Sequence, residues 1–210
     1  MDILSSQWFL QLSTIIIFVL SLLLAAMLTV KYAKTKSKSH LFWSLGLWCF
    51  TIGALLEIIF AFGIYSDALM AAYLFIVAIL VEFLALGSLY LLKNRKFVRY
   101  YSIFFAASAV FTLYSVAMPG IKNMLLNYVV EGPPPLIVTL ASSIATFPAA
   151  IILIVVAAMG YRKRHSNKLL SIITGVVVVS VAGTLYIASF PSFLYYSEFI
   201  GIVLLWLGFI

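Results

Sequence analysis

The stretch ALMAAYLFIVAILVEFLALGSLYLLKNRKFVR, residues 68–99, contains both signals that decide the fold. Its apolar part, residues 68–92, has one charged side chain, Glu82, and the basic residues begin immediately after it. A bilayer core about 30 Å thick needs about 20 apolar residues of helix, at about 1.5 Å per residue. Residues 68–92 therefore predict a transmembrane helix that ends at a basic connection.

The composition of the whole chain agrees with a membrane protein. Of its 210 residues, 65% are hydrophobic and 9% are charged, whereas a soluble domain averages about 45–50% apolar and about 25% charged residues. These values exclude a soluble globular enzyme, a disordered tail and a disulfide-stapled secreted module. The single cysteine, Cys49, cannot form an intramolecular disulfide.

Six further stretches meet the same length requirement as residues 68–92. The sequence therefore predicts an all-α integral membrane protein, with residues 1–210 forming one bundle of seven transmembrane helices. The predicted helices lie near 8–30, 41–64, 68–92, 97–118, 136–160, 169–189 and 193–210. The connection 119–135 is the longest, and its run Pro133-Pro134-Pro135 is expected to be extended.

The placement of the basic residues predicts the orientation of the bundle. Every one of the 13 except Lys122 lies on one of three alternate connections: Lys31, Lys34, Lys36, Lys38; Lys93, Arg95, Lys96, Arg99; Arg162, Lys163, Arg164, Lys168. Cytoplasmic loops carry an excess of Lys and Arg. We therefore expect a multi-pass protein of the cell membrane with its N-terminus outside and its C-terminus inside. Because topology accounts for the net charge of +7, no nucleic-acid partner is expected.

This sequence lacks the ligand residues that the known cofactor and metal sites of membrane proteins require. A retinal protein needs a lysine in its last helix, and residues 193–210 contain none. Haem needs axial ligands inside helices, whereas His40 and His165 lie in or beside the basic connections. A zinc cluster would need more Cys and His residues. We therefore expect no cofactor and no metal. Without a recognisable nucleophile–base pair or phosphate-binding loop, we also expect that the protein is not an enzyme.

Three carboxylates, Glu57, Glu82 and Glu198, lie inside predicted helices. An ionisable group near the bilayer centre costs about 2.5–3.5 kcal/mol on insertion scales and usually faces the bundle interior. Each glutamate shares its helix face with small residues three or four positions away, which let another helix approach closely: Gly53, Ala61, Ala78, Ala85, Gly201. No Lys or Arg lies in the helix cores to pair with them, so each carboxyl group either holds a proton or binds a cation from solution.

The depths of the three carboxylates predict which of them meet. Counting about 1.5 Å per residue from each helix midpoint places Glu57 about 7 Å and Glu198 about 5 Å outward of the midplane. The same count places Glu82 about 3 Å inward. Glu57 and Glu198 are therefore expected to meet in the outer half of the bilayer if the second and seventh helices are neighbours.

Pro148, near the middle of helix 136–160, is a candidate hinge. Proline in a helix frees the carbonyl group of the residue four positions earlier, here residue 144, and can kink the helix. Next to it, Ala141, Ala145 and Ala149 form a ridge of small residues, which is typical of ordinary helix packing.

Two classes of function remain. The first is a small transporter or channel for protons, cations or a small solute, with Glu57, Glu82 and Glu198 as its polar path and Pro148 as its hinge. The second is a non-catalytic accessory subunit or receptor component of a larger membrane complex, which docks through small-residue helix faces. In the second reading each glutamate is structural and donates one interhelical hydrogen bond, worth about 0.6 kcal/mol. Because three carboxylates are expected to face the bundle interior, we favour transport slightly over the accessory-subunit function.

Overall fold

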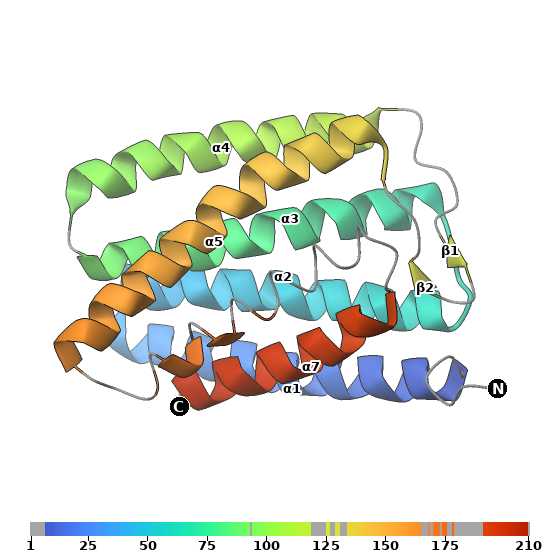
Figure 1. The fold of residues 1–210 in the computed structure, drawn as a ribbon, viewed down its shortest axis with the longest axis horizontal. Coiled ribbons are helices and arrows are strands. Elements are labelled where there is room, and N and C mark those ends of the chain that lie inside the picture. The colour runs from blue at the N-terminus through green and yellow to red at the C-terminus, as the bar shows by residue number, and fades with distance from the viewer. Residues whose placement is uncertain are drawn as a thin grey trace.

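A computed structural model of the chain describes residues 7–92, 94–118, 125–126, 129–130, 134–164, 168, 170–172, 174–175, 178 and 191–209. The long helices lie side by side in Figure 1. Their bounds are α1 (Gln7–Thr35), α2 (Lys38–Ala61), α3 (Asp67–Leu89), α4 (Arg95–Ala117), α5 (Leu136–Arg164) and α7 (Pro191–Phe209). A 3-10 turn, η2 (Tyr90–Leu92), continues α3. The observed helix bounds agree with the predicted ones to within a few residues.

Five helices in the described part of the chain are long and apolar enough to cross a membrane. They are α1, α2, α3 with η2, α4 and α5. The apolar run of α7, Tyr196–Gly208, is shorter. The predicted sixth helix, 169–189, falls largely outside the described residues. The prediction of a membrane protein built from several transmembrane helices is confirmed, whereas the count of seven spans stays a prediction.

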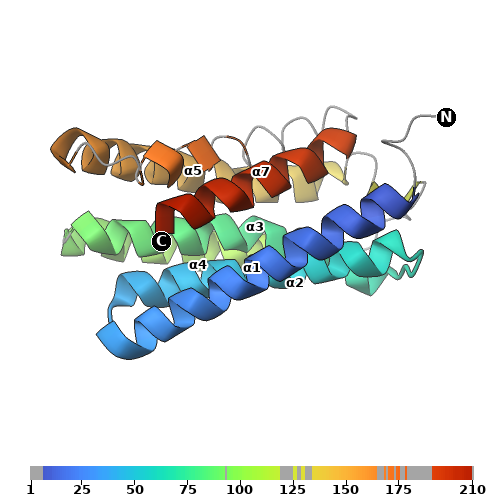
Figure 2. The same cartoon turned by 90° about the horizontal axis from the view of Figure 1, so that it is seen from below.

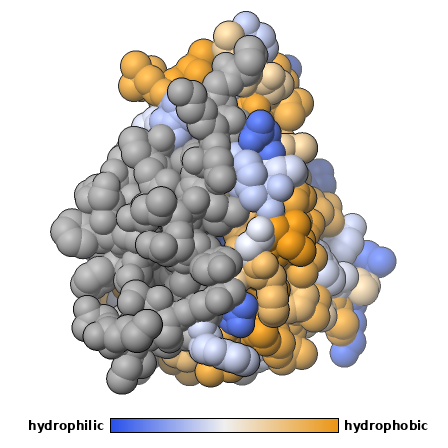
Figure 3. Space-filling model, turned by 90° about the vertical axis from the view of Figure 1, so that its right-hand side faces the viewer, coloured by the Kyte–Doolittle hydropathy of each residue, from blue (hydrophilic) through white to orange (hydrophobic). Residues whose placement is uncertain are grey.

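The outer faces of the helices are strongly apolar, as lipid contact requires. On α4, Ile103 and Val110 are 60% and 67% exposed, and on α5 Phe147 and Ile151 are each 60% exposed. In the end-on view of Figure 3, most of the coloured surface is apolar, with separate hydrophilic residues among it. An apolar surface this extensive is an aggregation liability in water but is the expected boundary against lipid.

Helix α3 lies at the centre of the bundle. It packs against α2, α4 and α5, and α1 packs against α2 and α7. Figure 2 shows α1 and α2 on one side of α3 and α5 and α7 on the other. The main core cluster is made of buried Leu, Ile, Val and Ala side chains from these helices, including Leu24, Leu47, Leu84, Ala149 and Ile202. The residues that matter below are therefore held by α3 and its neighbours.

The connection between α2 and α3 is a tight turn built by a glycine and a serine. Gly63 has φ of 80°, a conformation that favours glycine. The backbone N–H of Gly63 donates to the Phe60 carbonyl at 2.8 Å, and that of Ile64 donates to the Ile59 carbonyl at 3.2 Å, which ends α2. Ser66 Oγ then accepts a hydrogen bond from the Leu69 N–H and caps α3. The two helices consequently run antiparallel in direct contact.

The connection 119–135 contains a small hairpin among its described residues, which the sequence did not predict. Strands β1 (Leu125–Leu126) and β2 (Val129–Val130) pair in antiparallel register, Leu125 with Val130 and Leu126 with Val129. Val130 is buried in a cluster with Leu56 and Phe60 of α2. This apolar contact explains the hairpin, which covers the end of α2 and makes the described fold helical with one short β element.

The basic connections gather at one end of the bundle. In Figure 1, the ends of α1, α3 and α5 and the starts of α2 and α4 lie at the left, and the hairpin and the α2–α3 turn lie at the right. The alternation read from the sequence therefore corresponds to two distinct ends of the structure. Which end faces the cytoplasm stays a prediction from the positive-inside rule.

Close approach of α2 and α3 near the basic end depends on glycine. A Cβ atom at Gly87 would lie 2.5 Å from Trp43 Cδ1 and 3.0 Å from the Ser39 carbonyl oxygen. Trp43 cannot move freely, because its Nε1 donates to Ser88 Oγ at 3.1 Å, and Ser39 Oγ donates to the Gly87 carbonyl at 2.7 Å. These hydrogen bonds between α2 and α3 therefore hold the contact in place.

We predict that Gly87→Ala destabilises the protein, whereas Gly53→Ala does not. Overpacking at Gly87 should cost about 1–3 kcal/mol, because Trp43 or the backbone must shift. A Cβ at Gly53 would meet only Val77 Cγ2, at 3.7 Å, an ordinary contact. Thermal unfolding of the purified protein in mild detergent measures both variants. Equal midpoints for the two alanine variants would contradict this account of the α2–α3 contact.

Candidate functional site

The structure brings Glu57 of α2 and Glu198 of α7 together. Their side chains lie close enough to interact with each other, and they are only 3% and 9% exposed. Two carboxyl groups this close can form a hydrogen bond to each other only when one of them carries a proton, because an ionised carboxylate can only accept. The contact expected from their similar depths is confirmed. We call Glu57 and Glu198 the carboxyl pair.

Tyr73 of α3 completes the carboxyl pair on the side of Glu57. Its hydroxyl group donates to Glu57 Oε1 at 2.7 Å, and its ring packs edge-on against Phe60 with centroids 5.7 Å apart. Sequence reasoning did not identify Tyr73. The available signal was its position inside an apolar helix, about 9 Å from the start of α3, rather than at its end.

Glu82 occupies a second site, between α3 and α4. Its side chain is fully buried, and Ser108 Oγ of α4 donates to its Oε1 at 2.5 Å. Ser108 Oγ also lies 3.0 Å from the carbonyl oxygens of Phe104 and Phe105. The bond to Glu82 joins two different helices, so Ser108 links α4 to α3.

A row of buried polar side chains follows the inner face of α4. Tyr101, Ser108, Thr112 and Ser115 are all buried, and spacings of seven, four and three residues place them on one helix face. Tyr101 interacts electrostatically with Glu82. We call these four residues the α4 polar row. The spacing of Ser108, Thr112 and Ser115 in the sequence places these three on one face of a helix, whereas Tyr101, near the basic end of α4, resembles the aromatic residues that are common at membrane surfaces.

Several buried oxygen atoms in these sites lack a donor or acceptor among the described residues. Apart from the mutual contact of the carboxyl pair, they are Oε2 of Glu57, Oε2 of Glu198, Oε2 of Glu82, Oη of Tyr101 and Oγ1 of Thr112. Leaving a buried polar atom unpaired costs about 1–3 kcal/mol. Native proteins keep such atoms where a proton, a water molecule or an ion supplies the missing interaction.

The carboxyl pair and Glu82 lie at different depths. Tyr73, which contacts the pair, and Glu82 are separated along α3 by about 14 Å, at about 1.5 Å per residue. No hydrogen bond among the described residues joins the two sites. Arg99, the basic residue of α4 nearest to Ser108 in sequence, is also about 14 Å from it along the axis. The two sites are therefore separate, and the Lys and Arg residues of these helices lie at their ends.

Pro148 lies inside α5, which runs as one helix from Leu136 to Arg164. The neighbouring hydroxyl groups bond within the helix, Thr146 Oγ1 to the Ser142 carbonyl at 2.8 Å and Ser142 Oγ to the Thr139 carbonyl at 3.1 Å. They are therefore not directed at a glutamate. A hinge at Pro148 stays a prediction.

The ridge of small residues on α5 is packed inside the chain. Ala141, Ala145 and Ala149 have no exposed surface, and α5 packs against α3 and α4. This ridge serves the chain's own helix packing, as small residues do in membrane bundles.

Comparisons with known proteins identify neither a family for this chain nor a protein of similar fold. No family model, no curated protein and no solved structure matches this chain. In the part of the chain that the structure describes, no three His, Cys, Asp or Glu side chains lie close enough to hold a metal ion.

We predict that Ser108→Ala destabilises the protein more than Ser44→Ala. Both serines are 4% exposed, but Ser44 Oγ donates only to the Leu41 carbonyl of its own helix. Removal of the Ser108 hydroxyl leaves Glu82 without its donor, at a cost of about 1–3 kcal/mol. Thermal unfolding midpoints in detergent compare the two variants. If Ser44→Ala lowers the midpoint as much as Ser108→Ala, the bond to Glu82 stabilises the protein no more than a hydroxyl bond within one helix does.

Proposed function

We propose that the chain is a small multi-pass membrane transporter or channel for protons or small cations. In this proposal the carboxyl pair and Glu82 are two stations of the polar path, and the protein converts no substrate chemically. The observation that carries the proposal is the contact between two buried carboxyl groups from α2 and α7.

The carboxyl pair supports the proposal because of its charge requirements. Two ionised carboxylates in contact repel each other, and in a buried site such a pair shares one proton or binds one cation between its members. Glu57 and Glu198 belong to helices far apart in sequence. A small displacement of α7 relative to α2 would therefore separate the two groups and change how tightly the proton or cation is held.

Glu82 and the α4 polar row supply a second station and a polar wall. Tyr101 and Thr112 lie about 17 Å apart along α4, with Ser108 and its bond to Glu82 between them. Ionisable groups such as Glu82 inside a membrane bundle mark ion and proton pathways, and the hydroxyl groups of the α4 polar row supply further polar atoms beside it. The path between the carboxyl pair and Glu82 requires water or a helix movement, for which Pro148 is the candidate hinge.

The proposed orientation follows from the basic connections. With seven spans and the basic end in the cytoplasm, the N-terminus is outside, the carboxyl pair lies in the outer half of the bilayer and Glu82 lies further in. Glu57 belongs to the last turns of α2, at the end of the bundle opposite to the basic connections. The two stations would then be reached from opposite sides of the membrane.

The alternative function, an accessory subunit, needs a docking surface for a partner helix. The α5 ridge of Ala141, Ala145 and Ala149 is already buried within the chain, so a partner would have to use another face. No described feature favours such a face over contact with lipid, and we therefore retain transport as the proposed function.

We predict that Glu57→Gln, Glu198→Gln and Glu82→Gln each slow cation or proton flux. The protein is reconstituted in liposomes that contain a dye sensitive to protons, to sodium or to potassium, and uptake of each ion is followed under an imposed potential in the corresponding gradient. Loss of an exchangeable carboxyl group should slow uptake about tenfold or more, because a barrier increase of about 1.4 kcal/mol gives a factor of ten. Asp67→Asn is the control, because Asp67 is an exposed carboxylate at the start of α3 that bonds Tyr65.

Two results would contradict the proposal. Wild-type liposomes that take up none of the three ions faster than protein-free liposomes would remove the transport function. Unchanged uptake in all three glutamine variants, with folding verified by their unfolding midpoints, would remove the carboxylates from the path.

A further inference from the structure

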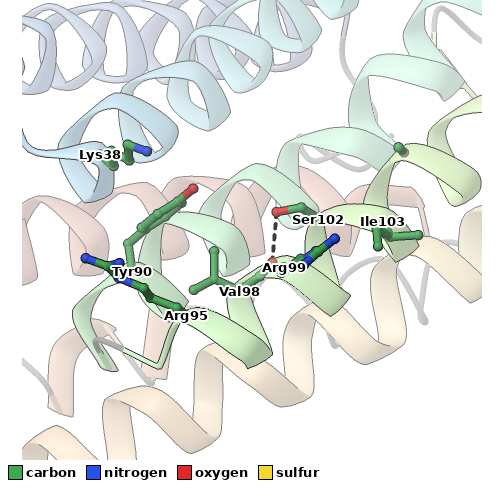
Figure 4. A pocket seen from close by; sticks show the side chains of 8 residues that line it. Lys38, Tyr90, Arg95, Val98, Arg99, Ser102 and Ile103 are labelled. Atoms are coloured by element: carbon green, nitrogen blue, oxygen red, sulfur yellow. Dashed lines mark hydrogen bonds between the residues drawn. The ribbon is translucent and has the colours of Figure 1, made fainter.

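A basic pocket of about 1190 Å³ opens at the end of the bundle that carries the basic connections. Its walls come from the start of α2, from η2 and from the first three turns of α4. Figure 4 shows Lys38 on α2 across from Tyr90 and Arg95, with Arg99, Ser102 and Ile103 following along α4. The pocket is separate from both carboxyl sites.

Three cationic side chains line this pocket, and no acidic residue does. They are Lys38, Arg95 and Arg99. Lys38 Nζ lies 5.7 Å from the centre of the Tyr90 ring, a cation–π contact that directs the ammonium group over the pocket wall. None of the three forms an ion pair with a described residue. Ser102 Oγ donates to the Val98 carbonyl at 2.8 Å, so the charged donors available to a ligand are the three cations.

The pocket changes from cationic to apolar along α4. Arg95 and Arg99 lie in the first turns, and Ile103 and Ala106 line it further along, with Arg95 and Ala106 about 17 Å apart on the axis. Val98 supplies a buried apolar wall between them. This gradient matches an amphiphile whose anionic group stays at the membrane surface while its apolar part continues along α4 toward the bilayer centre.

The positive-inside rule explains why basic residues lie at this end, but it does not explain why cations from two helices line one pocket with an apolar extension. The volume also exceeds the range of about 300–1,000 Å³ that is usual for small-molecule sites. A free phosphate ion would leave most of it empty and would not use its apolar wall.

We infer that this pocket binds an anionic phospholipid, with its phosphate-bearing headgroup on Arg95, Arg99 and Lys38 and its acyl chain along Ile103 and Ala106. Guanidinium groups suit the oxygen atoms of a phosphate group because they can bind two of them at once. Because the ligand contacts both α2 and α4, its binding stabilises the native bundle. The inference is independent of the proposed transport function.

The test measures the unfolding midpoint of the purified full chain in neutral detergent with three additives: phosphatidylglycerol, phosphatidylcholine and inorganic phosphate. We predict that phosphatidylglycerol raises the midpoint by about 4 °C or more, a shift typical of 1–2 kcal/mol in a chain of this size, and that the other two do not. Arg95→Gln/Arg99→Gln should lose the shift, and Lys38→Gln, a milder change, should reduce it. Lys34→Gln/Arg162→Gln, which removes two exposed charges outside the pocket, should keep it.

Native mass spectrometry gives a second readout, in which wild-type protein and the control double variant retain phosphatidylglycerol and the pocket variants do not. Equal stabilisation by phosphatidylcholine, or an equal loss in the control variant, would overturn the inference in favour of general detergent or surface-charge effects. Stabilisation by inorganic phosphate as large as that by phosphatidylglycerol would assign the pocket to a free anion and overturn the lipid assignment.

Discussion

Every carboxyl group buried in this bundle has to be satisfied inside the protein, because the bilayer core offers neither water nor a counter-ion. This requirement ties together the helices that surround the sites. Glu57 joins α2 to α7 through Glu198 and to α3 through Tyr73, and Glu82 joins α3 to α4 through Ser108. The polar contacts thus connect helices that are not all consecutive in the chain, and they leave oxygen atoms in each site that a proton or cation can occupy.

The bundle combines two kinds of helix contact. Near the basic end, Gly46 and Gly87 allow α2 and α3 to approach so closely that a Cβ atom at either position would clash with the opposite helix. Such a contact is steric and does not depend on protonation. The contact between Glu57 and Glu198 near the other end depends on a proton or a cation. Under the proposed function, a change of charge at the carboxyl pair would alter the position of α7 without separating α2 from α3.

Much of the fold could be predicted from the sequence, and the partners of the carboxylates could not. Helix bounds follow from apolar length and from the basic connections, so residues 136–160 were placed within a few positions of α5. The similar depths of Glu57 and Glu198 predicted their contact only on the condition that α2 and α7 are neighbours, which the sequence does not establish. Whether Tyr73 and Ser108 contact these glutamates depends on how each helix is rotated about its own axis. The sequence of an apolar helix specifies this rotation only loosely, even when its polar residues share one face. The hairpin at Leu125–Val130 escaped prediction because its strands are only two residues long.

The most direct test of this account is an infrared spectrum of the reconstituted protein, in the carbonyl-stretch region of protonated carboxylic acids. The account predicts such a band at neutral pH, shifted in heavy water, because the carboxyl pair shares a proton inside the bundle. The band should lose intensity in Glu57→Gln/Glu198→Gln and keep it in Asp67→Asn. A band that is equally strong in wild-type protein and in the double variant would show that the pair holds no proton. In that case, only a change in the bands of the ionised carboxylates on addition of sodium or potassium would retain these residues as a cation site. The absence of both signals would contradict the central claim.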